Sequence, residues 1–326
     1  MSYRAKMTLP AAGMLALFAC VTLAFVSVAH QSAPGPRAEE RPARPVLMPM
    51  VAFAGGVFES SGVAHVPGTD GVLFVDDGRD AEVFWMRLTG GREQAGEIKA
   101  IKLGANVRDM EGMTYDGEHF YVVGSLSKYK TPDLAGLARF RFDPATQRVE
   151  GVEVVNGLKR LLTRNVEELR GMEETKYRDG GINLEGVAWD PVNRRILLGV
   201  RSPVVDGNAL VIPLRLRDER RPLSAANVEV EGGRAIRLPF GGAGIRSIEY
   251  DERAGAFHVI TGAGPNAEKL DFKLWQWDGQ AERPAVRELG SYDRRLKPEG
   301  YTRAAAGGRD FGFFVFDTSG YAAAAE

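Results

Sequence analysis

A short sequence phrase recurs five times along the chain, and three of its copies begin with glutamate. These glutamates are the residues best suited to do chemistry. Glu111, Glu185 and Glu299 are each followed directly by glycine. Carboxylate oxygens are the ligands that a hard cation such as calcium prefers. If the fold brings these three side chains together, they are candidate metal ligands, with calcium as the candidate cofactor.

Basic and hydroxyl side chains depart from this repetition and are candidates for binding an anion. Arg246 stands where three of the phrases carry glutamate, and Ser125, Lys128 and Arg201 have no counterparts in the other repeats. Guanidinium and ammonium groups bind carboxylates and phosphates through charge-assisted hydrogen bonds. The candidate ligand-binding residues are therefore Ser125, Ser127, Lys128, Arg201, Arg246 and Lys297.

The recurring phrase also predicts the fold. Its five copies begin at Ser61, Glu111, Glu185, Arg246 and Glu299, and four of them are followed by a second apolar run. A four-stranded propeller blade needs about 40–50 residues, and most of the intervals between copies can hold one. The sequence therefore predicts an all-β chain with a single β-propeller of five blades. Six blades remain open if the long interval from Glu111 to Glu185 contains a degenerate blade.

The third interval shows the expected strands most plainly, at residues 184–189, 195–201, 209–216 and 234–239, with turn-forming residues between them. Asp116, Asp190 and Asp251 follow the first strands and are interpreted as turn residues. The last repeat is too short for a complete blade. Residues 45–55 lie just upstream of blade one and are expected to supply a closing strand to the last blade.

One helical insertion is expected at residues 158–172. Its apolar residues recur at steps of three and four and form one stripe. The sequence leaves two roles open for this helix: packing on a blade edge, or covering the channel as a lid.

Propeller topology predicts which residues share a face. The loop that enters the first strand of a blade and the loop after its second strand lie on the same side of the disc. The glutamates and basic residues above should therefore meet at one mouth of the channel, whereas His65, His119 and His258 do not map there. This argues against a serine–histidine–carboxylate triad. A structural role for Glu-Gly is the alternative, because glycine permits close approach and glutamate can accept backbone N–H bonds.

The N-terminus has the features of an export signal. Arg4 and Lys6 precede an uncharged run over residues 7–29, and small residues at Ser27 and Ala29 suit cleavage. Residues 1–29 are thus a signal peptide or an uncleaved membrane anchor, 30–45 a Pro-rich linker and 46–326 the propeller domain. The expected location is periplasmic or secreted, or membrane-anchored through residues 7–29. Cys20 is the only cysteine, so a cleaved chain has no thiolate chemistry.

Several phrases, in order, resemble one family. These are residues 61–68, 125–128, 183–191, 197–204, 244–251 and 297–300. Together they are similar to the bacterial family catalogued as domain of unknown function 3616 over residues 55–320. The resemblance implies a propeller that is distantly similar to phytase-like and esterase-like propellers, and hence calcium-dependent phosphoester hydrolysis. It draws attention to Ser127, Lys128, Glu185 and Arg201.

Two functions follow from these observations, and the sequence leaves open whether the protein is an enzyme. The first is an exported propeller that binds a small anionic molecule or a cell-envelope protein at the channel mouth. The second is a calcium-assisted hydrolase of a phosphoester or similar anionic substrate. The formal net charge of −1 gives no basic field that would collect nucleic acid.

Overall fold

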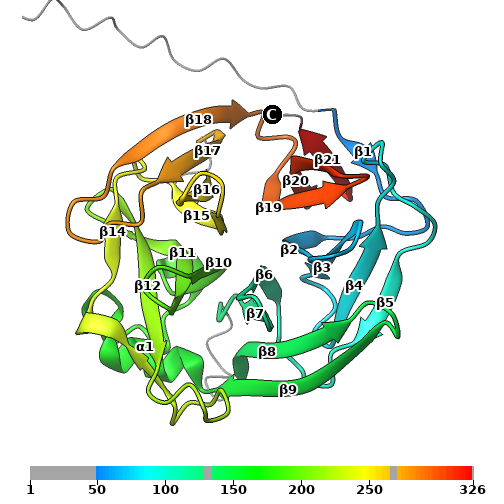
Figure 1. The fold of residues 1–326 in the computed structure, drawn as a ribbon. Helices are drawn as coiled ribbons and strands as arrows, with labels where there is room; N and C mark the ends of the chain where they lie inside the picture. The colour runs from blue at the N-terminus through cyan, green and yellow to red at the C-terminus, as the bar shows by residue number, and fades with distance from the viewer. Residues whose placement is uncertain (1–48, 128–133, 265–269, 325–326) are drawn as a thin grey trace, which may run out of the picture. The chain divides into compact units, whose positions relative to one another are not determined.

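Five antiparallel β-sheets follow one another along the chain and are arranged as the blades of a propeller (Figure 1). The structure is a computed structural model that describes residues 49–127, 134–264 and 270–324. The inner strand of each blade packs on the inner strand of the next, and the last packs on the first, so the ring is closed. The predicted five-bladed, all-β fold is confirmed, and the residues described between Glu111 and Glu185 form no additional blade.

The strands of blades one, two and four run outward from the central channel in chain order. Blade one contains β2 (Ser60–His65), β3 (Gly71–Asp76), β4 (Glu82–Arg87) and β5 (Lys99–Lys102). Blade two contains β6 (Met110–Tyr115), β7 (Phe120–Gly124), β8 (Ala135–Asp143) and β9 (Arg148–Asn156). Blade three contains β10 (Asn183–Asp190), β11 (Arg195–Val205), β12 (Asn208–Leu216), β13 (Val228–Val230) and β14 (Ile236–Leu238). Blade four contains β15 (Gly244–Asp251), β16 (Ala256–Gly262), β17 (Phe272–Trp277) and β18 (Val286–Tyr292).

Blade five joins the two ends of the described chain. It contains β19 (Pro298–Ala306), β20 (Arg309–Phe316) and β21 (Gly320–Ala324), and its outer strand is β1 (Val51–Ala52). Val51 pairs with Tyr321, so the expected N-terminal closing strand is confirmed. Pairing of the first described strand with the last closes the ring. Strand β1 supplies the outer strand that blade five would otherwise lack.

The outer edge of blade three differs from the expected single strand at 234–239. The long strand β12 pairs with β14 through Ala209–Val211 and with β13 through Leu214–Leu216. Pro213, which lies between these two pairings, has no N–H to donate to an outer neighbour. The edge is therefore divided between two short strands that η3 (Glu231–Gly233) separates.

The helical insertion is shorter than expected. Helix α1 (Leu158–Asn165) ends where Val166 adopts an extended conformation, and the short 3₁₀ turn η1 (Glu167–Leu169) follows. A second 3₁₀ turn, η2 (Tyr177–Asp179), precedes blade three. The predicted apolar stripe is nevertheless buried, because Leu158, Leu162, Val166 and Leu169 all enter the core shared by blades two and three. Packing on the blades is therefore the role that the structure gives this insertion.

Residues 1–48, which include the expected signal or anchor and the linker, lie outside the described residues. All described residues belong to the compact unit that begins at Ala43. Within the described ranges, none of the helices combines the length and apolar character needed to cross a bilayer.

Glycine in the repeated phrase is required by the close approach of neighbouring inner strands. A Cβ atom at Gly300 would lie 2.1 Å from the carbonyl oxygen of Ser61 in β2, and one at Gly62 would lie 2.3 Å from the backbone nitrogen of Met113 in β6. Backbone atoms cannot move aside as side chains do. The glycines are therefore structural, as the close-approach interpretation of Glu-Gly expects.

We predict that Gly300→Ala lowers the free energy of unfolding by about 1–3 kcal/mol, because the added methyl must push β19 away from β2. Chemical denaturation of the full chain measures the change. Gly90→Ala is the matched control, since its Cβ would lie 3.4 Å from the nearest atom, the Cα of Gly307, at an exposed site. Equal effects of the two substitutions would contradict the packing argument.

Candidate functional site at the channel mouth

Every inner strand carries a β-bulge at the first residue of its repeated phrase. In β6, for example, the pairing register shifts between Met110 and Gly112, so Glu111 has no partner in the ladder. A bulge of this kind turns the extra side chain in a new direction. The residues at the five bulges are Ser61, Glu111, Glu185, Arg246 and Glu299. All five line one cavity of about 340 Å³ at the mouth of the channel.

The same cavity brings together most of the residues that the sequence analysis selected. Arg201 and Lys297 join Glu111, Glu185, Glu299 and Arg246 in its lining. The other charged residues of the lining are Asp77, Arg294 and Asp317. Acidic and basic groups are therefore nearly balanced within a small volume, and their pairing decides what the cavity can bind.

Arg246 occupies the space between two of the three glutamates. Its Nη1 atom lies 3.0 Å from Glu185 Oε2 and donates to Glu299 Oε1 and Oε2 at 2.7 and 2.9 Å. All three side chains are buried. Burial alone would lower the pKa of Arg246, but the charges of Glu185 and Glu299 raise it, so the guanidinium stays charged. Burial also raises the pKa of Glu299, which settles at about 7 although Arg246 lowers it.

Arg201 is held against the other side of Glu185. Its Nη1 atom donates to Glu185 Oε1, which also accepts a 2.9 Å hydrogen bond from Asn183 Nδ2. Its Nε atom donates to the carbonyl oxygen of Ala263 at 3.3 Å, and its guanidinium lies 5.3 Å from the ring centre of Tyr177. The Arg201 side chain keeps 22% of its surface exposed, so the guanidinium is fixed in place while it faces the cavity.

Glu111 differs from the other two glutamates because no described residue forms an ion pair or hydrogen bond with it. Burial raises its pKa well above the usual range, and the nearby charges of Glu185, Asp109 and Glu299 raise it further. Such an environment favours the protonated form of a carboxyl. It can therefore donate a hydrogen bond to a ligand, or a proton to a reacting group.

The rim of the cavity contains groups that the repeat pattern did not single out. Burial raises the pKa of Asp77 to about 7, together with a hydrogen bond to Glu59 and the charges of Glu59 and Asp109. Arg294 is exposed and pairs with no residue in the described ranges. It lies in an irregular loop outside the repeated phrase, so no spacing signal identified it.

Ser125 and Ser127 are not among the residues that line the cavity. Both hydroxyls donate to Asp109 Oδ2, and Ser127 does so at 3.1 Å. Ser125 is buried. The two serines therefore fix the loop after β7 to the entry of β6, and their role in ligand binding stays a prediction. Lys128 lies outside the described residues.

The expected metal ligands lie in one cavity but are differently engaged. Arg246 already lies between Glu185 and Glu299, and Glu111 is the remaining member of the set. Across residues 49–127, 134–264 and 270–324, no three His, Cys, Asp or Glu side chains are grouped so that they could hold a metal ion. The metal role of the three glutamates stays a prediction, for which calcium titration is the test.

Comparison with known families agrees with the fold. Residues 144–297 match the family described as "Protein of unknown function (DUF3616)". This part of the chain is similar to that family. The matched stretch includes Glu185, Arg201 and Arg246, so the expected resemblance is confirmed where the ion pairs of the mouth are formed. No curated protein shows a sequence match to this chain.

Solved structures with a similar course of the chain have low sequence identity to it. A glucose dehydrogenase is 11% identical, with 85% of this chain and 99% of that chain covered and a TM-score of 0.45. The soluble aldose sugar dehydrogenase from Escherichia coli is 10% identical, with coverages of 85% and 98% and a TM-score of 0.45. A GH43 β-1,3-galactosidase is 13% identical, with coverages of 84% and 94% and a TM-score of 0.45. Similarity at this level transfers no activity to this chain.

We predict that Glu111→Gln becomes more stable relative to the wild type as pH rises. Below about pH 4.5, Glu111 is protonated in both the folded and the unfolded chain, so the substitution changes little. Above that pH the unfolded chain loses the proton while the folded chain keeps it, and the wild type loses stability. Glutamine removes this penalty. Urea denaturation from pH 4 to 9 measures the difference, and Glu97→Gln at an exposed site is the control. A pH-independent difference would contradict the raised pKa of Glu111.

Removal of the buried guanidinium should be costly. We predict that Arg246→Met lowers the free energy of unfolding by about 3–5 kcal/mol at pH 8, because Glu185 and Glu299 lose their shared cation. The loss should shrink as pH falls toward 7, because Glu299 without Arg246 takes up a proton at a higher pH than in the wild type, where its pKa is about 7. The second substitution Glu299→Gln in the Arg246→Met chain should recover part of the stability. A pH-independent loss, or no recovery, would mean that packing alone explains the effect.

Proposed function

We propose that this propeller binds a small molecule with an anionic group, either a carboxylate or a phosphate, in the cavity at the channel mouth. The observation that carries the proposal is the pair of guanidiniums held by Glu185. Arg201 and Arg246 both contact that one carboxylate, and both residues line the cavity. Guanidiniums fixed in this way can bind an anion with little loss of side-chain freedom.

The charge balance of the cavity supports an anionic ligand. Two glutamates are compensated by two arginines, and Lys297 Nζ lies 2.5 Å from Asp317 Oδ2. Burial and the neighbouring carboxylates favour the protonated form of Glu111. Among the described lining residues, no carboxylate forms an ion pair with Arg294. The cavity therefore gains net positive charge once Asp77, whose pKa is about 7, takes up a proton.

The size of the cavity favours a small ligand. A volume of about 340 Å³ lies at the low end of the range for small-molecule sites. The exposed part of Arg201 and the charged rim at Arg294 and Lys297 would contact the anionic group. The carboxyl of Glu111, in its protonated form, would donate a hydrogen bond to a polar group of the same ligand.

The calcium-assisted hydrolase, expected as the alternative, would need Glu111, Glu185 and Glu299 to turn toward a metal ion. Such a change must first displace Arg246 from between two of them. A partner protein of the cell envelope remains a further candidate for the same mouth. Export through residues 1–29 is part of the proposal, and it places the ligand in the periplasm or outside the cell.

We predict that inorganic phosphate or succinate binds the full chain and that Arg201→Gln weakens binding by about tenfold or more, since one charge-assisted hydrogen bond is lost. Binding of succinate, which stays ionised over this range, should strengthen as pH falls through 7, because protonation of Asp77 removes a negative charge from the rim. Isothermal titration calorimetry at pH 6 and 8 measures both effects. Arg283→Gln, an exposed arginine outside the cavity, is the matched control.

Thermal unfolding with calcium and after chelation is the companion experiment. A ligand that binds only the folded chain must raise the midpoint. A calcium-dependent rise that disappears in Glu185→Gln would replace our proposal with the metal-assisted hydrolase. If neither anion binds, or if Arg201→Gln and Arg283→Gln behave alike, the anion site is wrong.

A further inference from the structure

A second, larger cavity lies at the opposite end of the channel. Its volume is about 830 Å³, and the inner strands line it with residues from their far ends. The mouth described above is lined by the first residues of the repeated phrases. This cavity is lined by the fifth residue of every phrase and by three of the fourth residues, Thr114, Glu249 and Thr302. The two cavities therefore share the same five strands but expose different side chains.

The fourth position of the phrase is small and uncharged in every blade except blade four. The residues at this position are Ala64, Thr114, Ala188, Glu249 and Thr302. Small side chains around the ring leave the space that the cavity occupies. Glu249 is the single ionisable group among them, so it interrupts the pattern of the repeat at this end as Arg246 does at the mouth.

Glu249 has little compensation from the protein. Its Oε2 atom accepts a 2.9 Å hydrogen bond from Thr114 Oγ1, which reaches across the channel from blade two. No described residue forms an ion pair with this carboxyl. Burial raises its pKa well above the usual range, and the nearby charge of Asp251 raises it further. The carboxyl therefore lines the cavity, and no positively charged side chain of the described residues forms an ion pair with it.

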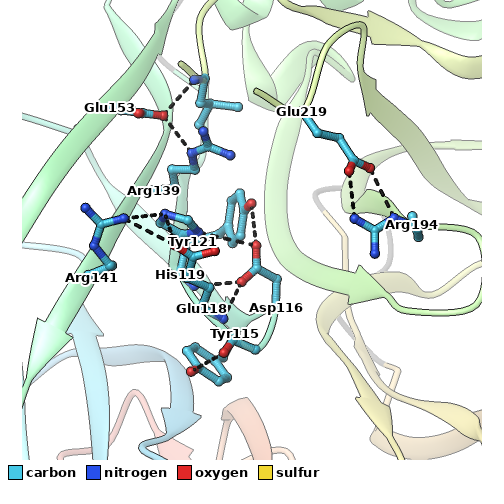
Figure 2. A network of polar contacts seen from close by, with 12 residues as sticks. Tyr115, Asp116, Glu118, His119, Tyr121, Arg139, Arg141, Glu153, Arg194 and Glu219 are labelled. Atoms are coloured by element: carbon cyan, nitrogen blue, oxygen red, sulfur yellow. Dashed lines mark hydrogen bonds and ion pairs between the residues drawn. The ribbon is translucent and has the colours of Figure 1, made fainter. Parts of the chain in front are cut away.

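Three aromatic side chains on neighbouring blades line the same cavity. They are Tyr115 on β6, Trp189 on β10 and Tyr250 on β15, and each is partly exposed. Trp189 lies parallel to Tyr121, with ring centres 6.5 Å apart. Figure 2 shows that Tyr121 is in turn held by Asp116, whose Oδ2 atom accepts from its hydroxyl at 2.8 Å. Tyr115 donates to the carbonyl oxygen of Gly117 at 2.7 Å. These contacts fix the rings before a ligand arrives.

The charges that surround these rings are mainly acidic. Besides Glu249, the cavity is lined by Asp116, Glu252 and Asp310, against two arginines, Arg253 and Arg303. Arg303 is directed to Asp251, with Nη1 3.5 Å from Oδ2. Burial lowers the pKa of His65, which keeps that ring neutral. An anion would meet an excess of negative charge here, whereas a cation would find a carboxylate and the negative faces of aromatic rings.

We infer that the cavity at the far end of the channel is a binding site for an organic cation with an ammonium group. The ammonium group would form an ion pair with Glu249 and lie against Trp189 and its neighbouring aromatic rings. On binding, Glu249 would release its proton to solvent, so the cation replaces the proton and charge is conserved. A hard metal ion needs several oxygen ligands, and within the described residues no three His, Cys, Asp or Glu side chains are grouped to hold one.

Choline and 3,3-dimethylbutan-1-ol are matched probes, because they share a shape and differ in the charge of one atom. We expect choline to bind the full chain at least about tenfold more tightly than the neutral alcohol, since only the cation gains from Glu249 and the ring faces. Isothermal titration calorimetry measures both affinities. Equal binding of the two probes, or no saturation by choline, would overturn the inference whether or not any variant folds.

Substitutions then locate the site. Glu249→Gln keeps the size of the side chain and an acceptor for Thr114, and it should weaken choline binding by about tenfold or more. Trp189→Leu should also weaken it, through loss of a ring face. Glu97→Gln, at an exposed site away from the channel, should leave it unchanged. Choline binding that survives Glu249→Gln in a folded chain would place the ligand elsewhere and refute the assignment.

Discussion

The close approach of the five inner strands around the channel is the constraint on which the rest of the structure depends. Gly62, Gly112 and Gly300 have backbone atoms of the next blade where a side chain would begin. Blade four carries serine at this position, and Ser247 Oγ accepts a 3.2 Å hydrogen bond from the backbone nitrogen of Tyr301 in the next blade. Strands packed this tightly cannot all continue a regular ladder, and each has a bulge beside the close contact. The bulge is what directs one side chain from every blade to the mouth.

This geometry makes blade four the source of chemical asymmetry. The ring at the mouth carries three carboxylates, and Arg246 supplies the cation that permits two of them to be buried together. At the other end the same strand places Glu249 in a ring of Ala and Thr side chains. Two ionisable side chains, Arg246 and Glu249, stand three residues apart on β15 and therefore lie at opposite ends of the channel. A perfectly regular repeat would have placed five equivalent side chains at each end of the channel, and neither end would be chemically asymmetric.

The repeated phrase predicted most of the fold and part of the candidate site. Blade number, the inner strands and the closing strand at residues 45–55 followed from the phrase and from the short last repeat. The strand β21 was missed because Gly320–Ala324 is rich in alanine and lacks the β-branched residues typical of strands. The helix was predicted too long, because periodicity continues through Val166 although the backbone there is extended. Apolar spacing shows which residues are buried more reliably than it shows where a helix ends.

The ion pairs between side chains of different blades are the part of the site that could not be predicted from the sequence. Glu185, Arg246 and Glu299 are far apart in the chain and were assigned separately, the glutamates to a metal and the arginine to an anion. Their mutual pairing depends on bulges in adjacent strands, which no spacing reveals. Ser125 and Ser127 were placed with the ligand because they end a second strand, yet Asp109 accepts both hydroxyls. Arg294 and Tyr177 lie outside the phrase and were not identified.

A buried ion-pair cluster needs a reason other than stability, since well-packed apolar residues can often replace such a cluster without loss. At this mouth the reason lies in orientation. Glu185 accepts from Asn183 and Arg201 and lies against Arg246, so one carboxylate fixes two guanidiniums at the cavity surface. Guanidinium side chains that were free in solution would lose conformational entropy when an anion ordered them. Here the fold has already ordered them. This order requires buried carboxylates, whose desolvation costs free energy.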